Sequence, residues 1–246
     1  MADIAGILRG RGVRLKGGGG DEALATQRAE LLRAIAADYP AFERVRDGVC
    51  AKAGLAPERL NDDTARQLLE LLRHHWLVRE RQDRFLAAGA AARRFLTGGW
   101  LEELAWLAAM EAGADEALCS QVLRWEVQGY YGENEIDVIV RKGGRLGFIS
   151  CKALQSRFNA DNRKQRSRLM DALHETDNLI DHFGRDGEQA AILVTTDLID
   201  EDRDRPRYMT LMGKAAALKV RVIPLEELTW QPLVAAIGEV VHGRSA

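Results

Sequence analysis

The segment NEIDVIVRKGGRLGFISCK, from Asn134 to Lys152, predicts two short strands joined by a tight turn. Apolar residues alternate with others between Ile136 and Val140, which is the period of a strand that buries one face. Lys142-Gly143-Gly144-Arg145 has the composition of a turn, and Leu146-Gly147-Phe148-Ile149 then forms the returning strand. We therefore expect an antiparallel hairpin over this segment.

An acid and a lysine mark the two ends of this hairpin. Asp137 enters the first strand and Lys152 leaves the second, so antiparallel pairing can bring them side by side although fifteen positions separate them. A carboxylate and an ammonium group that converge at the end of a sheet suit a divalent metal ion and a phosphoryl group. The alternative is that Asp137 flanks a turn and Lys152 is a solvated strand end.

A helical pattern precedes the hairpin. Gly98-Gly99-Trp100-Leu101-Glu102-Glu103 opens an amphipathic run that ends at Gly113, so we expect a helix that starts at the two glycines. Glu102 then lies in the first turn. Stabilisation of the helix dipole is the alternative role for Glu103, and partly for Glu102.

A glycine-capped helix with a glutamate, followed by a hairpin with Asp137 and Lys152, resembles the PD-(D/E)xK nuclease superfamily. The motifs FLTGGWLEE, NEIDVIV and FISCK resemble more narrowly the nuclease domain of CRISPR-associated CARF nucleases, which cyclic oligoadenylate activates. The resemblance covers roughly residues 60–228. It implies a nuclease that hydrolyses phosphodiester bonds with Mg²⁺ or Mn²⁺ as cofactor.

The resemblance also implies the residues of the catalytic site. Glu102 and Asp137 are expected to bind the metal, with the Ser150 hydroxyl and the backbone carbonyl of Cys151 completing the shell. Lys152 is expected to orient the attacking water and to offset charge on the scissile phosphate. The superfamily usually has an acid where Ser150 stands, although the CARF-linked nucleases include Ser-Cys-Lys versions. The Cys151 side chain is expected to point into the core.

Two further groups of charged residues are candidates. Glu135 is either an auxiliary metal ligand or a solvated acid at the start of the strand. A basic segment follows the hairpin, and the resemblance places its helix beside the active-site cleft, where cations would hold a phosphate backbone. A solvated helix face is the alternative. The candidate nucleic-acid-binding residues are Arg157, Arg163, Lys164, Arg166 and Arg168.

Composition limits the classes of protein that fit. The chain has 246 residues, of which 46% are hydrophobic, so it can bury a substantial core. A net charge of -2 excludes a generally basic surface, so nucleic-acid binding would need a local patch or a bound metal. The three cysteines lack the spacing of a zinc site or a disulfide framework. Without a signal peptide or a long apolar run, we expect a cytoplasmic protein with no membrane partner.

We expect an α/β (α+β) fold in three parts: a flexible glycine-rich N-terminus over residues 1–20, a helical, winged-helix-like domain over 21–95, and a PD-(D/E)xK nuclease-like domain over 96–246. The last part is expected to be a restriction-endonuclease-like mixed sheet with flanking helices. Two helices are expected over 21–54 and a small hairpin after His75. The first strand of the sheet is expected over 122–131, with a turn at 132–134, and a charged loop over 197–206.

The N-terminal segment is basic, with Arg9, Arg11, Arg14 and Lys16 before four glycines. It is either a nucleic-acid-binding tail or a disordered terminus. In the family that the chain resembles, a nucleotide-sensing CARF domain precedes this region. About twenty residues are too few to form such a domain, so we expect a chain without it.

Several functional alternatives stay open. The sequence does not choose between DNA and RNA, or between antiviral defence and other pathways. The chain can also be a noncatalytic nucleic-acid-binding or regulatory subunit that uses the nuclease fold as a scaffold. A third alternative is a structural subunit whose sensor partner protein supplies the nucleotide-binding domain. A homodimer is a further expectation, because related nucleases work in pairs.

Overall fold

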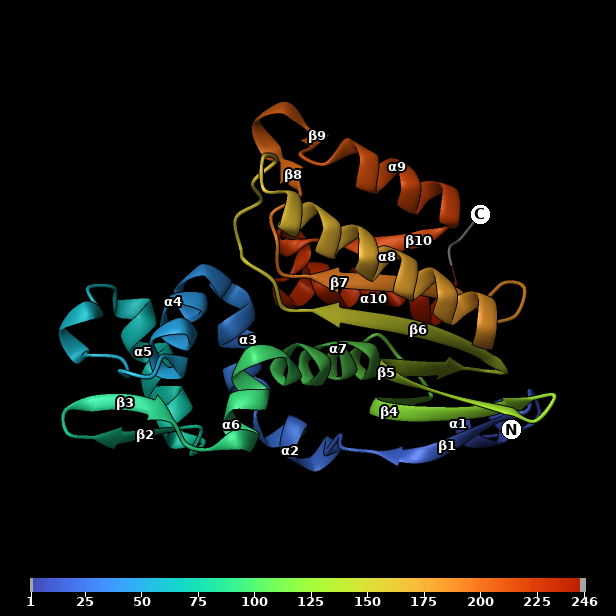
Figure 1. Cartoon of the computed structure of the whole chain (residues 1–246), viewed down its shortest axis with the longest axis horizontal. Helices are drawn as coiled ribbons and strands as arrows, with labels where there is room; N and C mark the ends of the chain where they lie inside the picture. The colour runs from blue at the N-terminus through green and yellow to red at the C-terminus, as the bar shows by residue number, and fades with distance from the viewer. Residues whose placement is uncertain (1, 244–246) are drawn as a thin grey trace.

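The hairpin predicted from the sequence lies inside a six-stranded sheet, in a computed structural model that describes residues 2–243 (Figure 1). The strand order is β1-β4-β5-β6-β7-β10, antiparallel from β1 to β6 and parallel from β6 to β10. The predicted mixed α/β class is confirmed. The strands are β1 (Val13–Gly18), β4 (Glu116–Val127), β5 (Tyr130–Lys142), β6 (Arg145–Lys152), β7 (Gln189–Val194) and β10 (Val220–Ile223).

Helices cover both faces of this sheet. On β7, Ala191 and Leu193 pack in the cluster with α7 and α10, whereas Ile192 and Val194 pack in a cluster with α8 and α9. A strand buried on both faces has a continuous apolar sequence, which explains the run before Thr195. The helices are α1 (Ile4–Arg9), α7 (Trp100–Glu111), α8 (Arg163–Phe183), α9 (Met209–Leu218) and α10 (Trp230–His242).

The helical region before α7 packs directly on the sheet domain. The Trp100 ring of α7 stacks on Tyr39 at a centroid distance of 5.5 Å and meets Phe42 edge-on at 5.4 Å. One hydrophobic cluster therefore joins residues from both regions. The predicted hairpin after His75 is confirmed, while the winged-helix interpretation stays a prediction. The elements are α2 (Glu22–Gln27), α3 (Ala29–Ala37), α4 (Tyr39–Cys50), η1 (Pro57–Arg59), α5 (Asp63–His74), β2 (Val78–Arg81) and β3 (Arg84–Ala87).

Three helices, not the expected two, span residues 21–54. Asp38 begins α4 by accepting a hydrogen bond from the Ala41 backbone N–H, with Pro40 in the first turn. Proline fits there because the first helical N–H groups have no partner within the helix. The expected loop at 197–206 also contains a small strand pair, β8 (Ile199–Asp200) and β9 (Arg205–Pro206), around η3 (Glu201–Arg203); η4 (Leu225–Glu227) precedes α10.

The N-terminal residues expected to be flexible form regular structure. α1 lies beside β1, and β1 pairs antiparallel with β4, with Val13 opposite Trp125. Ile4, Leu8 and Val13 are buried in one cluster with strand residues of the sheet. Their burial explains why the segment is ordered, since the glycines that suggested flexibility begin only at the end of β1.

The first long strand differs from the expectation of 122–131. β4 begins at Glu116, and its turn into β5 is Gln128-Gly129 rather than residues 132–134. Both turn residues have positive φ, 52° and 83°, as a two-residue hairpin turn requires. Gly132 lies within β5 opposite Trp125, whose ring occupies the space that a side chain would fill: an added Cβ would be 2.3 Å from it.

The expected helix start at Gly98-Gly99 is wrong. The helix begins as α6 (Ala90–Arg94), continues through a π-helical turn, η2 (Phe95–Gly99), and runs on as α7. In this turn the Thr97 hydroxyl donates a hydrogen bond to the Arg93 carbonyl at 2.8 Å. Glu102 therefore follows a continuous helix rather than a free helix end, which removes the dipole alternative.

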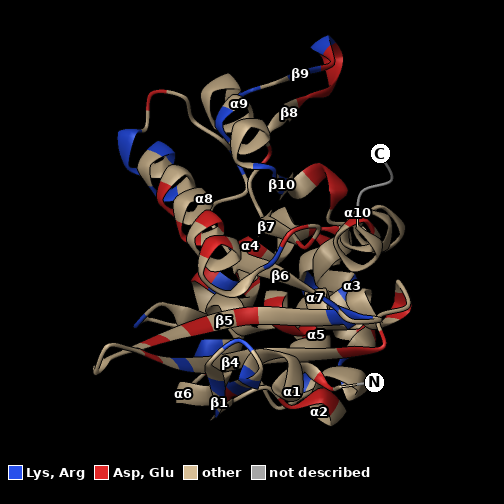
Figure 2. Ribbon diagram, turned by 90° about the vertical axis from the view of Figure 1, so that its right-hand side faces the viewer, with Lys and Arg blue, Asp and Glu red and all other residues tan. Residues whose placement is uncertain are grey.

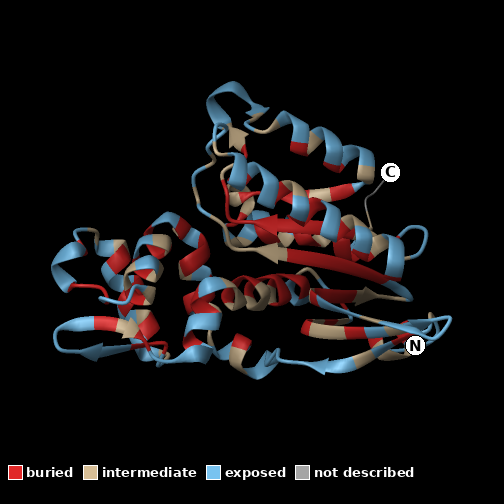
Figure 3. Cartoon of the chain, viewed as in Figure 1, coloured by how far each residue is buried: buried red, intermediate tan, exposed pale blue. Residues whose placement is uncertain are grey.

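Burial differs along the sheet. Figure 3 shows β6 and β7 largely buried, whereas the far end of the β4–β5 hairpin is exposed.

Among the described residues, no helix combines the length and apolar character needed to cross a membrane.

Candidate active site

The regular alternation of side chains between the two faces of the sheet is interrupted in β4 and β5 at Ser120 and Asp137. Val138 packs in the cluster on the α7 face, but Ile136 and Ile139 both pack in the cluster on the opposite face. Residues three apart cannot share a face in a regular strand, so the alternation is interrupted between them. The register pairs Cys119 with Val138 and Gln121 with Ile136, so Ser120 and Asp137 lie between these pairs without pairing themselves, and Ser120 has a φ of 51°. This local irregularity gives Asp137 a direction that differs from that of its apolar neighbours.

The Asp137 carboxylate reaches across to β6. Its Oδ2 accepts a hydrogen bond from the Cys151 backbone N–H at 2.6 Å and another from the Ser150 hydroxyl at 3.3 Å. The backbone pairing of β5 with β6 ends at Val138 and Ile149, so the carboxylate satisfies an N–H that the ladder leaves without a strand partner. Asp137 is thereby fixed at the end of the hairpin.

Glu102 approaches the same place from α7. The Ser120 hydroxyl donates a hydrogen bond to its Oε2. Burial raises the pKa of Glu102, and the negative charge of Asp137 raises it further. Burial likewise raises the pKa of Asp137, against the lowering effects of the Cys151 N–H and of Lys152. Two carboxylates that resist ionisation next to each other are an arrangement that a bound cation would stabilise.

Lys152 completes this group from the end of β6. Its ammonium group forms an ion pair with Glu175 of α8, with Nζ to Oε2 at 2.9 Å. Burial opposes the charge of Lys152, but the hydrogen bond to Glu175 and the charge of Asp137 outweigh it and raise the pKa of the lysine. Lys152 is therefore an ammonium ion at neutral pH, which suits contact with a phosphate and excludes a role as general base.

Cys151 and Glu135 lie at the margins of the site. The Cys151 thiol packs against the core cluster and lies 3.8 Å from the Leu101 carbonyl of α7. Burial raises its pKa well above the usual range, so it is not a thiolate. Glu135 is exposed and pairs with Arg94 at 3.5 Å. Glu103 turns away to Arg28, with Nη1 to Oε1 at 2.9 Å, and burial raises its pKa to about 7.

The five candidate nucleic-acid-binding residues are exposed, and four of them lie on α8 before Glu175. The last four lie in the first turns of α8, and the first in the loop before it. Arg163 precedes Glu175 by twelve residues, or about 18 Å along a helix. Figure 2 shows the basic residues at the beginning of α8 and acidic residues further along it. The residues are Arg157, Arg163, Lys164, Arg166 and Arg168.

Two residues of the site carry no signal in the sequence. Ser120, the donor to Glu102, becomes a candidate only when the register of β4 with β5 is known. Glu175 is one of several acids on α8, and only the packing of this helix beside β6 shows which one meets Lys152.

The candidate site offers few side chains that could bind a metal ion. Within residues 2–243, no group of three or more His, Cys, Asp or Glu side chains is placed so that it could hold a metal ion. Glu102 and Asp137 supply two carboxylates, so a cation bound between them needs further oxygen ligands from hydroxyl, backbone or water. Their hard, anionic oxygens fit Mg²⁺ or Mn²⁺ better than a softer metal.

Comparison with known proteins identifies the fold and the family. Protein VC1899 from Vibrio cholerae aligns over 96% of this chain and 60% of its own, with a TM-score of 0.69 and 18% identity. Can2 from Sulfobacillus thermosulfidooxidans, solved in complex with cyclic tetra-adenylate, aligns over 96% and 61%, with a TM-score of 0.57 and 14% identity. The chain thus spans about three fifths of these two proteins, which show its fold. A search of curated proteins gave no match.

A family model for Card1-like endonuclease domains matches residues 89–229. This range is more than half of the chain and contains Glu102, Asp137 and Lys152. The chain belongs to the Card1-like endonuclease domain family.

Proposed function

We propose that the chain is a divalent-metal-dependent endonuclease that hydrolyses phosphodiester bonds of DNA or RNA. The observation that carries this proposal is the convergence of Glu102, Asp137 and Lys152 from α7, β5 and β6 in a chain of an endonuclease family. Two partly buried carboxylates and a protonated lysine have the charges that phosphodiester hydrolysis requires.

Mg²⁺ or Mn²⁺ is the proposed cofactor. Glu102 and Asp137 would hold it, with the Ser150 hydroxyl and the Cys151 backbone carbonyl as further oxygen ligands. Such an ion, when bound, lowers the pKa of a coordinated water and withdraws charge from a phosphoryl oxygen. The raised pKa values of both carboxylates support the assignment, because burial disfavours their ionised forms and a bound cation would favour them.

The side chains of the site have separate roles in this proposal. Asp137 is oriented by the Cys151 N–H and the Ser150 hydroxyl, and Glu102 by the Ser120 hydroxyl. Lys152 donates a hydrogen bond to the attacking water or to a phosphate oxygen and offsets the charge that develops there. Glu175 positions the lysine from α8 and keeps it protonated.

The substrate and the biological role are proposed from the exposed cations of α8 and from the family resemblance. The exposed cations at the beginning of α8 are proposed to contact phosphates of the nucleic acid. A role in antiviral defence, with control by a cyclic oligoadenylate through a sensor domain or sensor partner, is proposed from the CARF-nuclease motifs and from Can2, which was solved with cyclic tetra-adenylate. A homodimer is proposed by the same resemblance.

A noncatalytic nucleic-acid-binding or regulatory subunit is the second candidate. Ser150 favours it, because the position usually carries an acid in the superfamily and a hydroxyl is a weaker ligand than a carboxylate. Binding of nucleic acid without cleavage at any metal concentration would establish this candidate.

Cleavage assays test the first candidate. Supercoiled plasmid, single-stranded DNA and RNA are incubated with Mn²⁺, Mg²⁺ or EDTA, using wild type, Asp137→Ala, Lys152→Ala and the surface control Lys214→Ala. We expect metal-dependent cleavage that falls at least about a hundredfold in the first two variants, because each removes charge at the reacting phosphate. The control should cleave like wild type. Cleavage that survives both substitutions would contradict the assigned site.

A further inference from the structure

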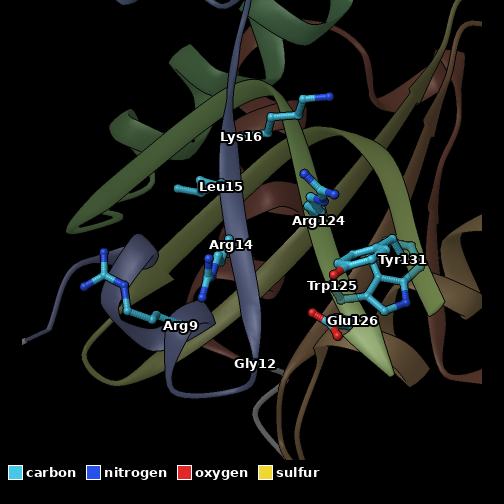
Figure 4. Close-up of a pocket in the computed structure, with 9 residues that line it drawn as sticks. All are labelled: Arg9, Gly12, Arg14, Leu15, Lys16, Arg124, Trp125, Glu126 and Tyr131. Carbon is cyan, nitrogen blue, oxygen red and sulfur yellow. The ribbon is translucent and has the colours of Figure 1, made fainter. Parts of the chain in front are cut away.

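A groove with a volume of about 650 Å³ lies along the edge strand β1, at the far end of β4 and β5 (Figure 4). We call it the β1 groove. Arg14 and Lys16 of β1, Arg124 of β4 and Tyr131 of β5 line it, together with Arg9 of α1. The basic N-terminal segment is therefore one wall of a groove rather than a tail, since β1 pairs with β4 along its length.

Like charges face each other in this groove. Arg14 stands directly opposite Arg124 in the register of β1 with β4. Two cations at directly opposite positions of an antiparallel pair repel each other, and an anion between them removes the repulsion. Both are exposed, and in the described part of the chain no ion pair joins Arg14 to an acid. In a chain whose net charge is -2, this local arrangement favours an anionic ligand.

Two acids moderate the groove: Glu126 of β4 is part of its lining, and Glu133 of β5 pairs with two of its cations. Glu133 of β5 pairs with Lys16 at 3.0 Å and with Arg124 at 3.9 Å. These partners are all half-exposed, so their ion pairs are weak and a phosphate can replace the carboxylate. Glu133 is thus a competitor for the same cations.

An exposed aromatic side chain lies beside the cations. Tyr131 is 63% exposed, and the Arg124 guanidinium lies 4.8 Å from the centroid of its ring. Figure 4 shows the Tyr131 and Arg124 side chains close together on the same side of the groove. Tyr130 is 80% exposed at the tip of the hairpin. Exposed aromatic rings next to arginines are the combination that stacks unpaired bases in single-strand binding proteins.

The groove and the candidate active site share two strands. Arg124 lies four residues from Ser120, and Tyr131 lies six residues from Asp137, which correspond to roughly 13 and 20 Å of strand. On β5, Glu133 pairs with Lys16 of the groove, while Glu135, two residues on, pairs with Arg94 just before the π-helical turn. One exposed face of the sheet therefore leads from the groove to the helix that carries Glu102.

We propose that the β1 groove binds a single-stranded segment of nucleic acid that extends from the candidate active site. Arg14 and Arg124 hold a phosphate between them, Lys16 neutralises the next part of the backbone, and Tyr131 stacks on an unpaired base. The inference rests on the proposed function, which supplies the nucleic acid, and it adds a binding surface about 13–20 Å away from the reacting phosphate.

Binding without cleavage tests the proposal. Fluorescence anisotropy measures the affinity of a single-stranded oligonucleotide for the Asp137→Asn chain in EDTA, over a series of salt concentrations. Arg14→Ala/Arg124→Ala should weaken binding and lower the salt slope by about 1.4, since each lost contact with a single strand removes about 0.7. A matched control, Lys52→Ala/Lys214→Ala, removes two exposed lysines elsewhere and should leave the slope unchanged.

Three single substitutions separate charge from stacking. Tyr131→Ala should weaken binding roughly tenfold with the same salt slope, whereas Tyr131→Phe keeps the ring and the affinity. Glu133→Gln should tighten binding, because it frees Lys16 and Arg124 for phosphate. Circular dichroism checks that each variant folds.

Binding that the Arg14→Ala/Arg124→Ala variant retains in full would overturn the proposal. If that variant instead converts a dimer to monomers and still binds the oligonucleotide, the groove is a contact between two copies of the chain, which also overturns it. The measurement does not depend on metal or on cleavage. A chain that binds through this groove but never cleaves would contradict only the proposed catalytic function.

Discussion

The Asp137 carboxylate orders the candidate site through its hydrogen bonds, but its negative charge lowers the stability of the folded chain when no metal is bound. It satisfies the Cys151 N–H, but burial raises its pKa, so its ionised form is less stable in the folded chain than in the unfolded chain. When the pKa of a carboxyl group is higher in the folded chain than in the unfolded chain, the protonated group stabilises the folded chain, and this contribution is fully present below the pKa of the unfolded chain. It is lost as the pH rises through the folded pKa. At neutral pH the metal-free chain therefore carries an unfavourable charge.

Asp137→Asn should raise the free energy of unfolding of the metal-free chain at pH 7.5. The amide oxygen can still accept from Cys151, and the unfavourable charge is gone. The gain should be on the order of 1 kcal/mol for each unit by which the pKa is raised, and it should shrink towards pH 4. Urea unfolding in EDTA measures it, with the exposed Asp161→Asn as control. A variant less stable than wild type at pH 7.5 would contradict the charge argument.

At the scale of elements, the interrupted alternation of side chains in β4 and β5 positions the candidate site. Ser120 takes a left-handed backbone conformation, which costs a non-glycine residue about 1–3 kcal/mol. Its hydroxyl at the same time donates to Glu102. The backbone irregularity and the orientation of a candidate metal ligand therefore depend on one residue.

Substitutions of Ser120 should separate these two effects. Ser120→Gly accepts the positive φ and should leave stability unchanged or higher by up to about 1 kcal/mol, while cleavage falls roughly tenfold because Glu102 loses its donor. Ser120→Val should destabilise the chain by about 2 kcal/mol or more, because a β-branched residue strongly disfavours this φ. Thermal unfolding and metal-dependent cleavage are measured in parallel. Full activity of the glycine variant would show that the hydroxyl has no role.

At the scale of the whole molecule, an ion pair ties the N-terminal segment to the far side of the sheet. Arg11 and Glu188 are almost completely buried and lie 2.6 Å apart, with 177 positions between them. Glu188 also accepts hydrogen bonds from the backbone N–H groups of Leu146 and Arg185. One buried carboxylate thus joins the segment between α1 and β1 to β6 and to the turn before β7.

Arg11→Met should destabilise the chain by about 3–5 kcal/mol, because it leaves the Glu188 charge buried without its partner. The double variant Arg11→Met/Glu188→Gln should recover much of the loss, since the neutral amide oxygen still accepts from the backbone. Guanidinium unfolding measures both, with Lys214→Ala as the surface control. Equal stability of wild type and the single variant would show that the N-terminal segment contributes little to the fold.

The sequence by itself determined the parts of this protein that depend on neighbouring residues. The turn at Gly143-Gly144, the alternation in β5 and the small hairpin after His75 were predicted correctly. Each follows from local backbone preference or from a short apolar period. The motifs around Glu102, Asp137 and Lys152 are equally local, and they indicated the family that the comparison then identified.

Only the tertiary structure decided the features that join distant segments. Gly98-Gly99 resembles a helix start, yet Trp100 packs on Tyr39 and the helix continues through the glycines. Gly132 resembles a turn, yet the Trp125 ring covers it within a strand. The β1 groove is likewise set by the pairing of β1 with β4. The physical reason is that burial and ion pairing between segments far apart in the chain outweigh local propensities of about 1 kcal/mol.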